Sequence, residues 1–257
     1  NAALTAPVAN SLTATFSYTI LEGQEDLDGI AVGTDIDLNG GTIIGSNSNI
    51  DAILTLNGTA SSAGVNVDGI RPIPFVDSTV PDPTNAAFDV TITFDEPVTG
   101  FTVAGIDVCN GTASNLTGSG TDYTATITPA ADGIVNIIIL PESAFDAAGN
   151  GNDPSNEFST EYDATRPVPT IASTTPDPTN TTFDVTITFT EDVTGFEVTD
   201  IDVTNGTADN FVSVSASEYT ATITPAADGD VIVLIPENVS QDAATNGNEA
   251  SNAFSVE

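Results

Sequence analysis

Several residue types that enzymes and nucleic-acid-binding proteins use are missing from this chain. It contains no Trp, Met, Lys or His, and its only basic residues are two Arg. No nucleophile elbow, phosphate-binding loop or zinc-ligand spacing occurs, and without His there is no histidine-based catalytic triad. Paired carboxylates are plentiful, but in so acidic a chain they arise by chance. We therefore predict a non-catalytic protein with no catalytic and no cofactor-binding residues.

Long apolar runs and cysteines are also scarce. No segment approaches the roughly 20 consecutive apolar residues of a membrane-spanning helix, so we expect no membrane span in this segment. The single cysteine, Cys109, cannot form a disulfide within the chain. Its counterpart in the repeat described below is Thr204. A small residue that is replaced in this way favours a structural role over a reactive thiol.

The charge of the chain is almost all of one sign. Against its two Arg stand 37 acidic residues, which gives a formal net charge of −35. Such a field repels nucleic acids and anionic membranes and attracts cations. We therefore expect no nucleic-acid partner, and saline or calcium-bearing surroundings that screen the self-repulsion.

What the chain does contain is typical of an all-β protein. Hydrophobic residues make up 39% of it, enough for one large core or two to three small ones. Val, Ile, Thr and Phe, which favour strands, supply most of that content. Residues 88–94 alternate apolar and polar side chains, as a half-buried strand does.

The chain also repeats itself. The stretch YTATITPAADG occupies residues 123–133 and again 219–229, and several other motifs recur at offsets of 95 or 96. We expect two copies of one domain, at residues 71–163 and 164–257. Residues 1–70 read as the closing half of a related repeat, so its sheet would have an exposed edge or be completed by another chain.

Each complete copy is predicted to be a seven-stranded immunoglobulin-like sandwich. In the second copy the strands are expected near residues 168–174, 183–190, 196–203, 208–214, 218–224, 230–235 and 252–257. The alternation places one face of the strands in the core. The predicted core residues are Phe88, Val90, Ile92, Phe94 and Ile127, with their counterparts Phe183, Val185, Ile187, Phe189 and Ile223.

Several motifs occur in the same order in both copies. They include DEPVTGF at 95–101 with EDVTGF at 191–196, and DAAGNGN at 146–152 with DAATNGN at 242–248. With these motifs the chain resembles the bacterial Ig-like repeats of large surface adhesins, tandem Ig-like or cadherin-like modules of secreted proteins. The resemblance implies an extracellular, cell-surface stalk or ligand-presenting filament, commonly stiffened by calcium between modules, and it does not imply catalysis.

Strand order in such a sandwich gathers the linker and two loops at one end. Three acidic residues occupy these positions in each copy. They are Asp68, Glu96 and Asp146 in the first and Asp163, Glu191 and Asp242 in the second. Converging carboxylates repel unless a cation lies among them, and hard oxygen ligands suit Ca²⁺. The alternative is that each caps a turn or faces solvent.

Polar neighbours of these positions complete the predicted metal sites. Asn150 and Asn246 could add carbonyl oxygens. Arg71 and Arg166 follow Asp68 and Asp163 by three residues, and an Arg fork can pair with a carboxylate, so each is expected to neutralise part of its acidic cluster.

Three functions are consistent with the sequence. The first is the stalk or interaction segment of a giant adhesin, and the second is a structural module of an extracellular filament or surface layer. The third is an accessory region of a secreted polysaccharide-degrading enzyme, against which the absence of Trp argues. The expected partners are other repeats of the same protein or neighbouring surface chains, with a glycan or protein ligand bound elsewhere in the full-length protein.

Overall fold

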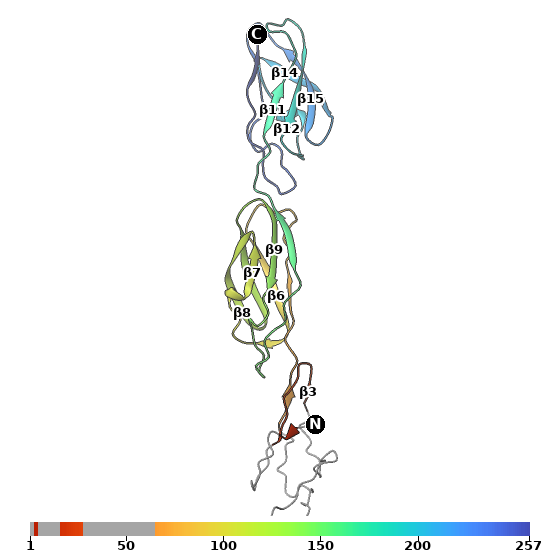
Figure 1. Ribbon diagram of the computed structural model, residues 1–257. Helices are drawn as coiled ribbons and strands as arrows, with labels where there is room; N and C mark the ends of the chain where they lie inside the picture. Colours follow the sequence, from red (N-terminus) through yellow and green to blue (C-terminus); the bar gives the residue numbers. More distant parts are fainter. Residues whose placement is uncertain (1–2, 5–15, 28–64) are drawn as a thin grey trace, which may run out of the picture.

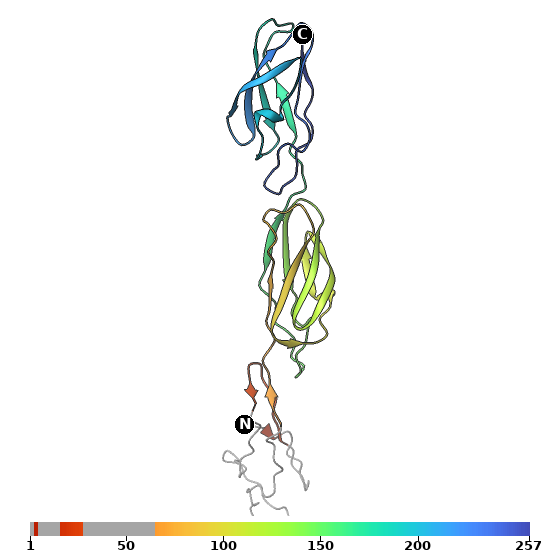
Figure 2. The same ribbon diagram turned by 180° about the vertical axis from the view of Figure 1, so that it is seen from behind.

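The computed structural model of the protein describes residues 3–4, 16–27 and 65–257. Two β-sandwiches lie end to end along the chain, with the C-terminus at the far end of the second sandwich (Figures 1 and 2). Both are built almost entirely of antiparallel strands, which confirms the all-β, tandem Ig-like prediction.

Before the first sandwich, two short strand pairs are described. β1 (Ala3–Leu4) pairs with β2 (Phe16–Ser17), and β3 (Glu25–Asp26) pairs with β4 (Val67–Asp68). The predicted closing-half repeat over residues 1–70, with its exposed edge, otherwise lies outside the described residues.

The first sandwich consists of two three-stranded sheets and one turn of 3-10 helix, η1 (Val103–Gly105). One sheet has the order β5 (Pro74–Asp77), β6 (Phe88–Val98) and β8 (Gly111–Pro129). The other has the order β10 (Phe158–Tyr162), β9 (Gly133–Ile139) and β7 (Ile106–Cys109).

The second sandwich repeats this plan with a four-stranded and a three-stranded sheet. The first sheet has the order β11 (Pro169–Ala172), β12 (Phe183–Phe189), β15 (Glu218–Pro225) and β14 (Gly206–Ser213). The second has the order β13 (Asp202–Thr204), β16 (Val231–Leu234) and β17 (Phe254–Val256), and η2 (Val198–Asp200) precedes β13.

The seven predicted strands are therefore found in the second sandwich, while the first has six. The difference lies in β8, whose 19 residues cover the part of the chain that β14 and β15 cover in the second sandwich. β8 turns back on itself near Gly118 and Gly120, which both have positive φ. A Cβ on Gly118 would lie 2.2 Å from the Asp122 carbonyl oxygen, so only glycine permits this close return.

One predicted strand is partly wrong. The segment 196–203 was expected to be extended throughout, but residues Val198–Asp200 form the 3-10 turn and the strand begins only at Asp202. The Asp200 carboxylate accepts a hydrogen bond from the Glu197 backbone N–H at 2.8 Å, a local side-chain bond that competes with strand pairing.

The predicted cores are confirmed. All ten predicted core side chains are at most 7% exposed. The eight that lie on β6 and β12 alternate with exposed or half-buried polar residues, and Phe88 and Phe183 pair directly with Ile127 on β8 and Ile223 on β15. Burying side chains of this size contributes about 1.5–3 kcal/mol each, so the inner faces of these strands fix the register of the sandwiches.

An asparagine side chain protects one edge of each sandwich. Asn156 accepts a hydrogen bond from the Val76 N–H at 2.8 Å and donates to the Val76 carbonyl at 2.9 Å, on the outer edge of β5. Asn252 bonds both backbone groups of Ile171 in the same way on β11. Each amide thus takes the place of a neighbouring strand at one position.

Candidate metal centres

The six predicted carboxylates come together in two groups of three. Asp68 ends β4, Glu96 lies in β6 and Asp146 lies in the loop between β9 and β10, and these residues form the first triad. Within it, one carboxylate oxygen of each residue lies within 4.8 Å of those of the other two.

The second triad repeats this arrangement with the same limit of 4.8 Å. Asp163 follows β10, Glu191 follows β12 and Asp242 lies in the loop between β16 and β17. In both triads the aspartate of the long loop is buried, with 5% exposure for Asp146 and for Asp242, while the other two members are half-buried.

A turn closed by an asparagine fixes the buried aspartate of each triad. The Asp146 carboxylate accepts backbone N–H bonds from Gly149 at 2.7 Å and from Asn150 at 2.8 Å. The Asn150 side chain donates to Asp146 Oδ2 at 2.7 Å and to the Asp68 carbonyl at 3.0 Å. One amide therefore holds the loop carboxylate against the linker.

The second triad uses the corresponding atoms. The Asn246 side chain donates to Asp242 Oδ2 and to the Asp163 carbonyl, both at 2.9 Å. The Asn246 N–H donates to Asp242 Oδ1 at 2.8 Å. The Asp163 carboxylate also accepts the Thr165 N–H at 3.0 Å. Two copies of one sequence thus build the same polar geometry at the start of each sandwich.

Asn150 and Asn246 therefore differ from the sequence expectation. Their side-chain nitrogens, and not their carbonyl oxygens, face the carboxylates. The reason is local, because a carboxylate accepts hydrogen bonds and the amide nitrogen is the donor within reach. Each asparagine orders its triad as a hydrogen-bond donor.

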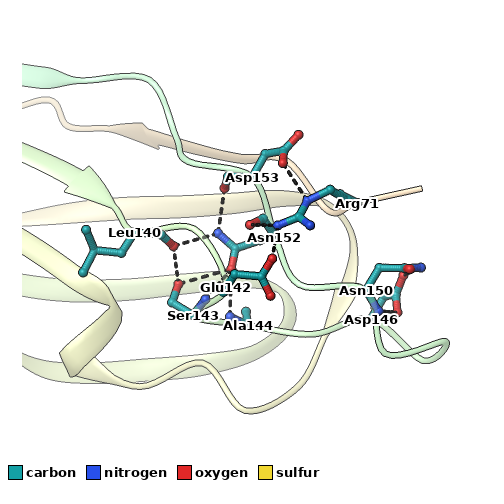
Figure 3. Close-up of polar contacts among 9 residues, drawn as sticks. All are labelled: Arg71, Leu140, Glu142, Ser143, Ala144, Asp146, Asn150, Asn152 and Asp153. Atoms are coloured by element: carbon teal, nitrogen blue, oxygen red, sulfur yellow. Dashed lines mark hydrogen bonds and ion pairs between the residues drawn. The ribbon is translucent and has the colours of Figure 1, made fainter. Parts of the chain in front are cut away.

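A second asparagine, which sequence reasoning missed, supports each loop from within. Asn152 is fully buried, and its Oδ1 accepts the N–H groups of Ser143 and Ala144 at 2.8 Å. Its Nδ2 donates to the carbonyls of Leu140 at 2.9 Å and Asp153 at 2.7 Å (Figure 3). The sequence signal for this asparagine is the NGN that ends the loop motif in both copies.

Asn248 has the same role in the second sandwich. It is fully buried, accepts the N–H groups of Val239 and Ser240, and donates to the carbonyls of Pro236 and Glu249. A buried amide with all of its bonds made stabilises one loop conformation, because any other leaves backbone groups unpaired.

The members of each triad respond differently to the shared charge. Burial raises the pKa of Glu96, and the neighbouring carboxylates of Asp146 and Asp68 raise it further. Burial alone would also raise the pKa of Asp146, but hydrogen bonds from the Asn150 side chain and from three backbone N–H groups outweigh it and hold this pKa below its ordinary value. Asp146 therefore stays ionised to lower pH than an ordinary aspartate, whereas burial and the repulsion from the other two carboxylates make Glu96 easier to protonate.

The glutamate of the second triad is in the same situation. Burial raises the pKa of Glu191, followed by the repulsion from Asp163, Asp242 and Asp132. Asp132 belongs to the first sandwich, so the field at this junction comes from both sandwiches. Sequence reasoning did not find Asp132.

The two arginines do not join the triads, which corrects the sequence prediction. Arg71 pairs with Glu142, and its Nε donates to Asp153 at 2.7 Å (Figure 3). Its guanidinium also donates to the Asn152 carbonyl at 3.1 Å. In Figure 3 the Arg71 side chain turns to this loop, away from Asp146.

Arg166 likewise binds the long loop of its own sandwich and not the triad. It pairs with Glu249 at 2.7 Å and donates to the carbonyls of Gly247 and Asn248. The loop presents backbone carbonyls and a carboxylate together, and a guanidinium fork satisfies several of these acceptors at once. Because the chain has no third basic residue, no protein cation neutralises either triad.

The geometry of each triad suits a calcium ion. Two oxygens bound to one Ca²⁺ at about 2.3–2.6 Å lie at most about 5 Å apart, and the triad oxygens lie within 4.8 Å of one another. Three carboxylates supply hard oxygen ligands from the linker, a strand end and a buried loop, so a bound ion would tie three segments together.

The class of this protein follows from its fold and from comparison with known sequences. Both sandwiches match the sequence profile of the bacterial Ig-like domain, over residues 73–162 and 163–257. The chain belongs to the bacterial Ig-like domain family. Within the residues that the structure describes, no helix is long and apolar enough to cross a membrane.

Individual relatives are more distant. The chain is 34% identical over 196 residues to chitinase A1 of Niallia circulans, a match that covers 72% of this chain and 27% of the chitinase. Among solved structures, invasin, a bacterial integrin-binding protein, is 16% identical with a TM-score of 0.37, covering 72% of this chain and 40% of invasin. InvD of Yersinia pseudotuberculosis is 16% identical with a TM-score of 0.29, covering 72% and 56%.

Proposed function

We propose that this chain is a non-catalytic stalk segment of a large, secreted bacterial cell-surface adhesin, and that calcium stiffens the junctions before its two sandwiches. The observation that carries the proposal is the duplicated triad. Three carboxylates meet at the same place in both copies, and both arginines are bonded elsewhere.

The electrostatics of the triads explain why an ion would change the mechanics. Two like charges within 4.8 Å of each other repel, by about 1 kcal/mol at the dielectric constant of water and by about 3 to 4 kcal/mol at a dielectric constant near 20. Without an ion, linker and loop carboxylates push the junction open. A bound Ca²⁺ is coordinated by the same carboxylates, and its positive charge offsets their repulsion.

The expected size of the effect depends on the affinity of the site. Calcium sites of extracellular modules have dissociation constants of about 10⁻⁴ to 10⁻³ M. At about 1 mM calcium the ion is at about 1 to 10 times such a dissociation constant, so binding stabilises the ordered junction by about 0.4 to 1.4 kcal/mol. A junction of this kind is ordered outside the cell and loosens when calcium is removed, which fits the strongly acidic composition.

Small-angle X-ray scattering of the chain in calcium and in chelator tests the proposal. We expect the maximum dimension to fall and the flexibility to rise in chelator. In millimolar calcium, Asp163→Ala and Asp242→Ala should shift the profile part of the way toward that of the parent in chelator, because each variant removes only the second triad and leaves the first intact. Asp202→Ala is the matched control, because Asp202 is an exposed aspartate of the same sandwich outside the triad.

The proposal also makes a direct binding prediction. Calorimetric titration should show calcium binding at the two triads, and one calcium ion fewer per chain in Asp242→Ala than in the parent. Scattering profiles that are the same with calcium, with chelator and in both variants would contradict the stiffening, and a titration without heat at millimolar calcium would contradict the site.

A second candidate is supported by the likeness to chitinase A1. In that case the sandwiches are an accessory region of a secreted polysaccharide-degrading enzyme. Sedimentation with insoluble chitin separates the two functions. A stalk segment stays in the supernatant at every concentration, whereas saturable retention on the polymer would favour the accessory role.

A further inference from the structure

The end of the first sandwich that faces the second one holds the linker, residues 163–166, in place. The Thr84 carbonyl accepts the Asp163 N–H at 2.9 Å. The Asp132 carboxylate accepts the Ala164 N–H at 2.8 Å with Oδ1 and the Thr165 hydroxyl with Oδ2. The linker therefore offers two N–H groups and one hydroxyl, and the first sandwich offers the three acceptors.

The same end also reaches the second sandwich itself. The Asn85 side chain donates to Asn246 Oδ1 at 3.1 Å. Asn246 is the residue that binds both Asp163 and Asp242. We call Thr84, Asn85 and Asp132 the exit face of the first sandwich. Its hydrogen bonds hold the start of the next sandwich.

The second sandwich carries the same residues at its own far end. The counterparts of Thr84, Asn85 and Asp132 are Thr179, Asn180 and Asp228, which form the exit face of the second sandwich. Their framework is already assembled. The Thr179 N–H donates to the Glu257 carbonyl at 2.7 Å, as the Thr84 N–H donates to the Glu161 carbonyl at 2.9 Å.

The loop that presents the acidic residue is braced alike in both sandwiches. Asn110 donates from its side chain to the Ala131 carbonyl at 2.8 Å, and Asn205 donates to the Ala227 carbonyl at 2.9 Å. Both asparagines have φ near +60°, the left-handed conformation that asparagine tolerates. Asp228 is thus held in the same loop geometry as Asp132.

What differs between the two faces is their occupation. Asp132 and Asn85 are bonded to the linker and to the second sandwich. Asp228 and Asn180 are exposed, and their side chains have no hydrogen-bond partner among residues 65–257. The second face thus presents the same side chains as the first, held by the same bracing hydrogen bonds.

The first junction is built from a different linker. There the residue at the Thr165 position is Ile70, which has no hydroxyl to donate. The preceding segment instead binds the backbone of Gly69, whose N–H donates to the Gln24 carbonyl at 2.8 Å and whose carbonyl accepts the Gly23 N–H at 2.7 Å. A linker of the form Asp-x-Thr can donate the hydroxyl hydrogen bond that Asp132 accepts, whereas one of the form Asp-Gly-Ile has no hydroxyl to donate.

We propose that Thr179, Asn180 and Asp228 form a docking surface for the Asp-x-Thr linker of another repeat of the same kind as the second sandwich. The acceptors match two backbone N–H groups and one hydroxyl, as they do at the occupied face. Asp163 takes part through its backbone N–H and not through its carboxylate, so no metal-binding atom is used in these contacts. We therefore expect the docking contacts to persist in chelator, although the junction is looser there than in calcium.

The occupied face provides the reference measurement. Cys109 is exposed and is the only cysteine, and Thr204 is its exposed counterpart, so Thr204→Cys gives a chain with one spin label on each sandwich. In chelator, Asp132→Ala should widen the distribution of distances between the labels about twofold or more. Asp228→Ala should leave it unchanged, because its face holds no linker in this chain.

The free face is tested by adding an occupant. A copy of residues 162–257 is joined after Glu257, which continues the spacing of the repeat because Glu257 is the counterpart of Glu161. Cys109→Ser removes the native label, and cysteines at position 204 and at its copy report on the new junction. Its distance distribution should be as narrow as that of the occupied junction, and Asp228→Ala should widen it as Asp132→Ala does in the original chain.

A variant of the occupant is the matched control. Replacing the added threonine that corresponds to Thr165 by valine removes the hydroxyl and keeps the shape, and it should widen the new junction as well. A broad distribution in the extended chain, or no response to Asp228→Ala, would overturn the proposal. If these variants widen the distance distributions as expected but calcium and chelator give the same scattering profile, the result would count only against calcium stiffening.

Discussion

Single buried amides decide the shape of the loops that carry Asp146 and Asp242. Asn152 and Asn248 are fully buried, and each binds four backbone groups of its loop. Removing a partner from a buried polar group costs about 1–3 kcal/mol, so these loops have one stable conformation. At the scale of single residues, the carboxylates of the two triads are therefore positioned by buried amides that are not themselves members of the triads.

One residue in the second loop is strained. Thr245 has φ of +70°, whereas its counterpart Gly149 has φ of +92°. A β-branched side chain is unfavourable in this region, and glycine is not. We predict that Thr245→Gly stabilises the second sandwich by about 1 kcal/mol in urea unfolding.

The reciprocal change is the control for this prediction. Gly149→Thr should destabilise the first sandwich by a similar amount, although a Cβ at Gly149 would meet no atom within 4 Å. Equal stabilities for Gly149→Thr and the parent chain would show that backbone conformation does not limit this turn.

At the scale of elements, the outer edges of β5 and β11 depend on a side chain in place of a neighbouring strand. Asn156 binds both the N–H and the carbonyl of Val76. We predict that Asn156→Ala lowers the free energy of unfolding of the first sandwich by about 1–2 kcal/mol, because two hydrogen bonds to the edge are lost.

The exposed edge should also become a site of association. Asn156→Ala is expected to aggregate at lower temperature than the parent, measured by light scattering during heating. Glu157→Ala changes the exposed neighbouring residue and should leave both properties unaltered. Identical unfolding and scattering curves for Asn156→Ala and the parent would contradict an edge-protecting role.

At the scale of the whole molecule, the two glutamates make the metal-free chain sensitive to pH. Folding raises the pKa of Glu96 and Glu191 above their ordinary value of 4.5. Between 4.5 and the raised values the folded chain binds more protons than the unfolded chain, so the free energy of unfolding decreases as pH rises through this window. The contribution of Asp146 has the opposite sign, since its pKa is lowered from 3.8, and it is lost only at more acidic pH.

We therefore predict that the metal-free chain is less stable at pH 7.5 than at pH 4.5. Glu191→Gln should remove part of this loss and raise the stability of the second sandwich at pH 7.5 by about 1 kcal/mol, because it removes repulsion at a half-exposed site. Urea unfolding in chelator measures the effect, with Glu157→Gln as the control. A variant that titrates like the parent would exclude Glu191 as the source.

The agreement between sequence and structure has identifiable causes. The alternation of Phe88, Val90 and Ile92 predicts their burial because side chains on a strand point to opposite faces in turn. The meeting of Asp163 with Glu191 and Asp242 follows from strand order, which brings a linker and two loops to one end of a sandwich. Neither inference depends on the conformation of an individual side chain.

The sequence by itself therefore determined the two copies, their all-β class, their cores and the set of acidic residues that lie together at each junction. Only the tertiary structure decided the partners of the arginines, the orientation of Asn246 and the role of Asp132 in holding the linker. Arg166 lies three residues from Asp163 in the chain but binds Glu249, 83 residues away. Contacts of this kind depend on which donors and acceptors the folded loops present to one another, and no periodicity or spacing in the sequence encodes that choice.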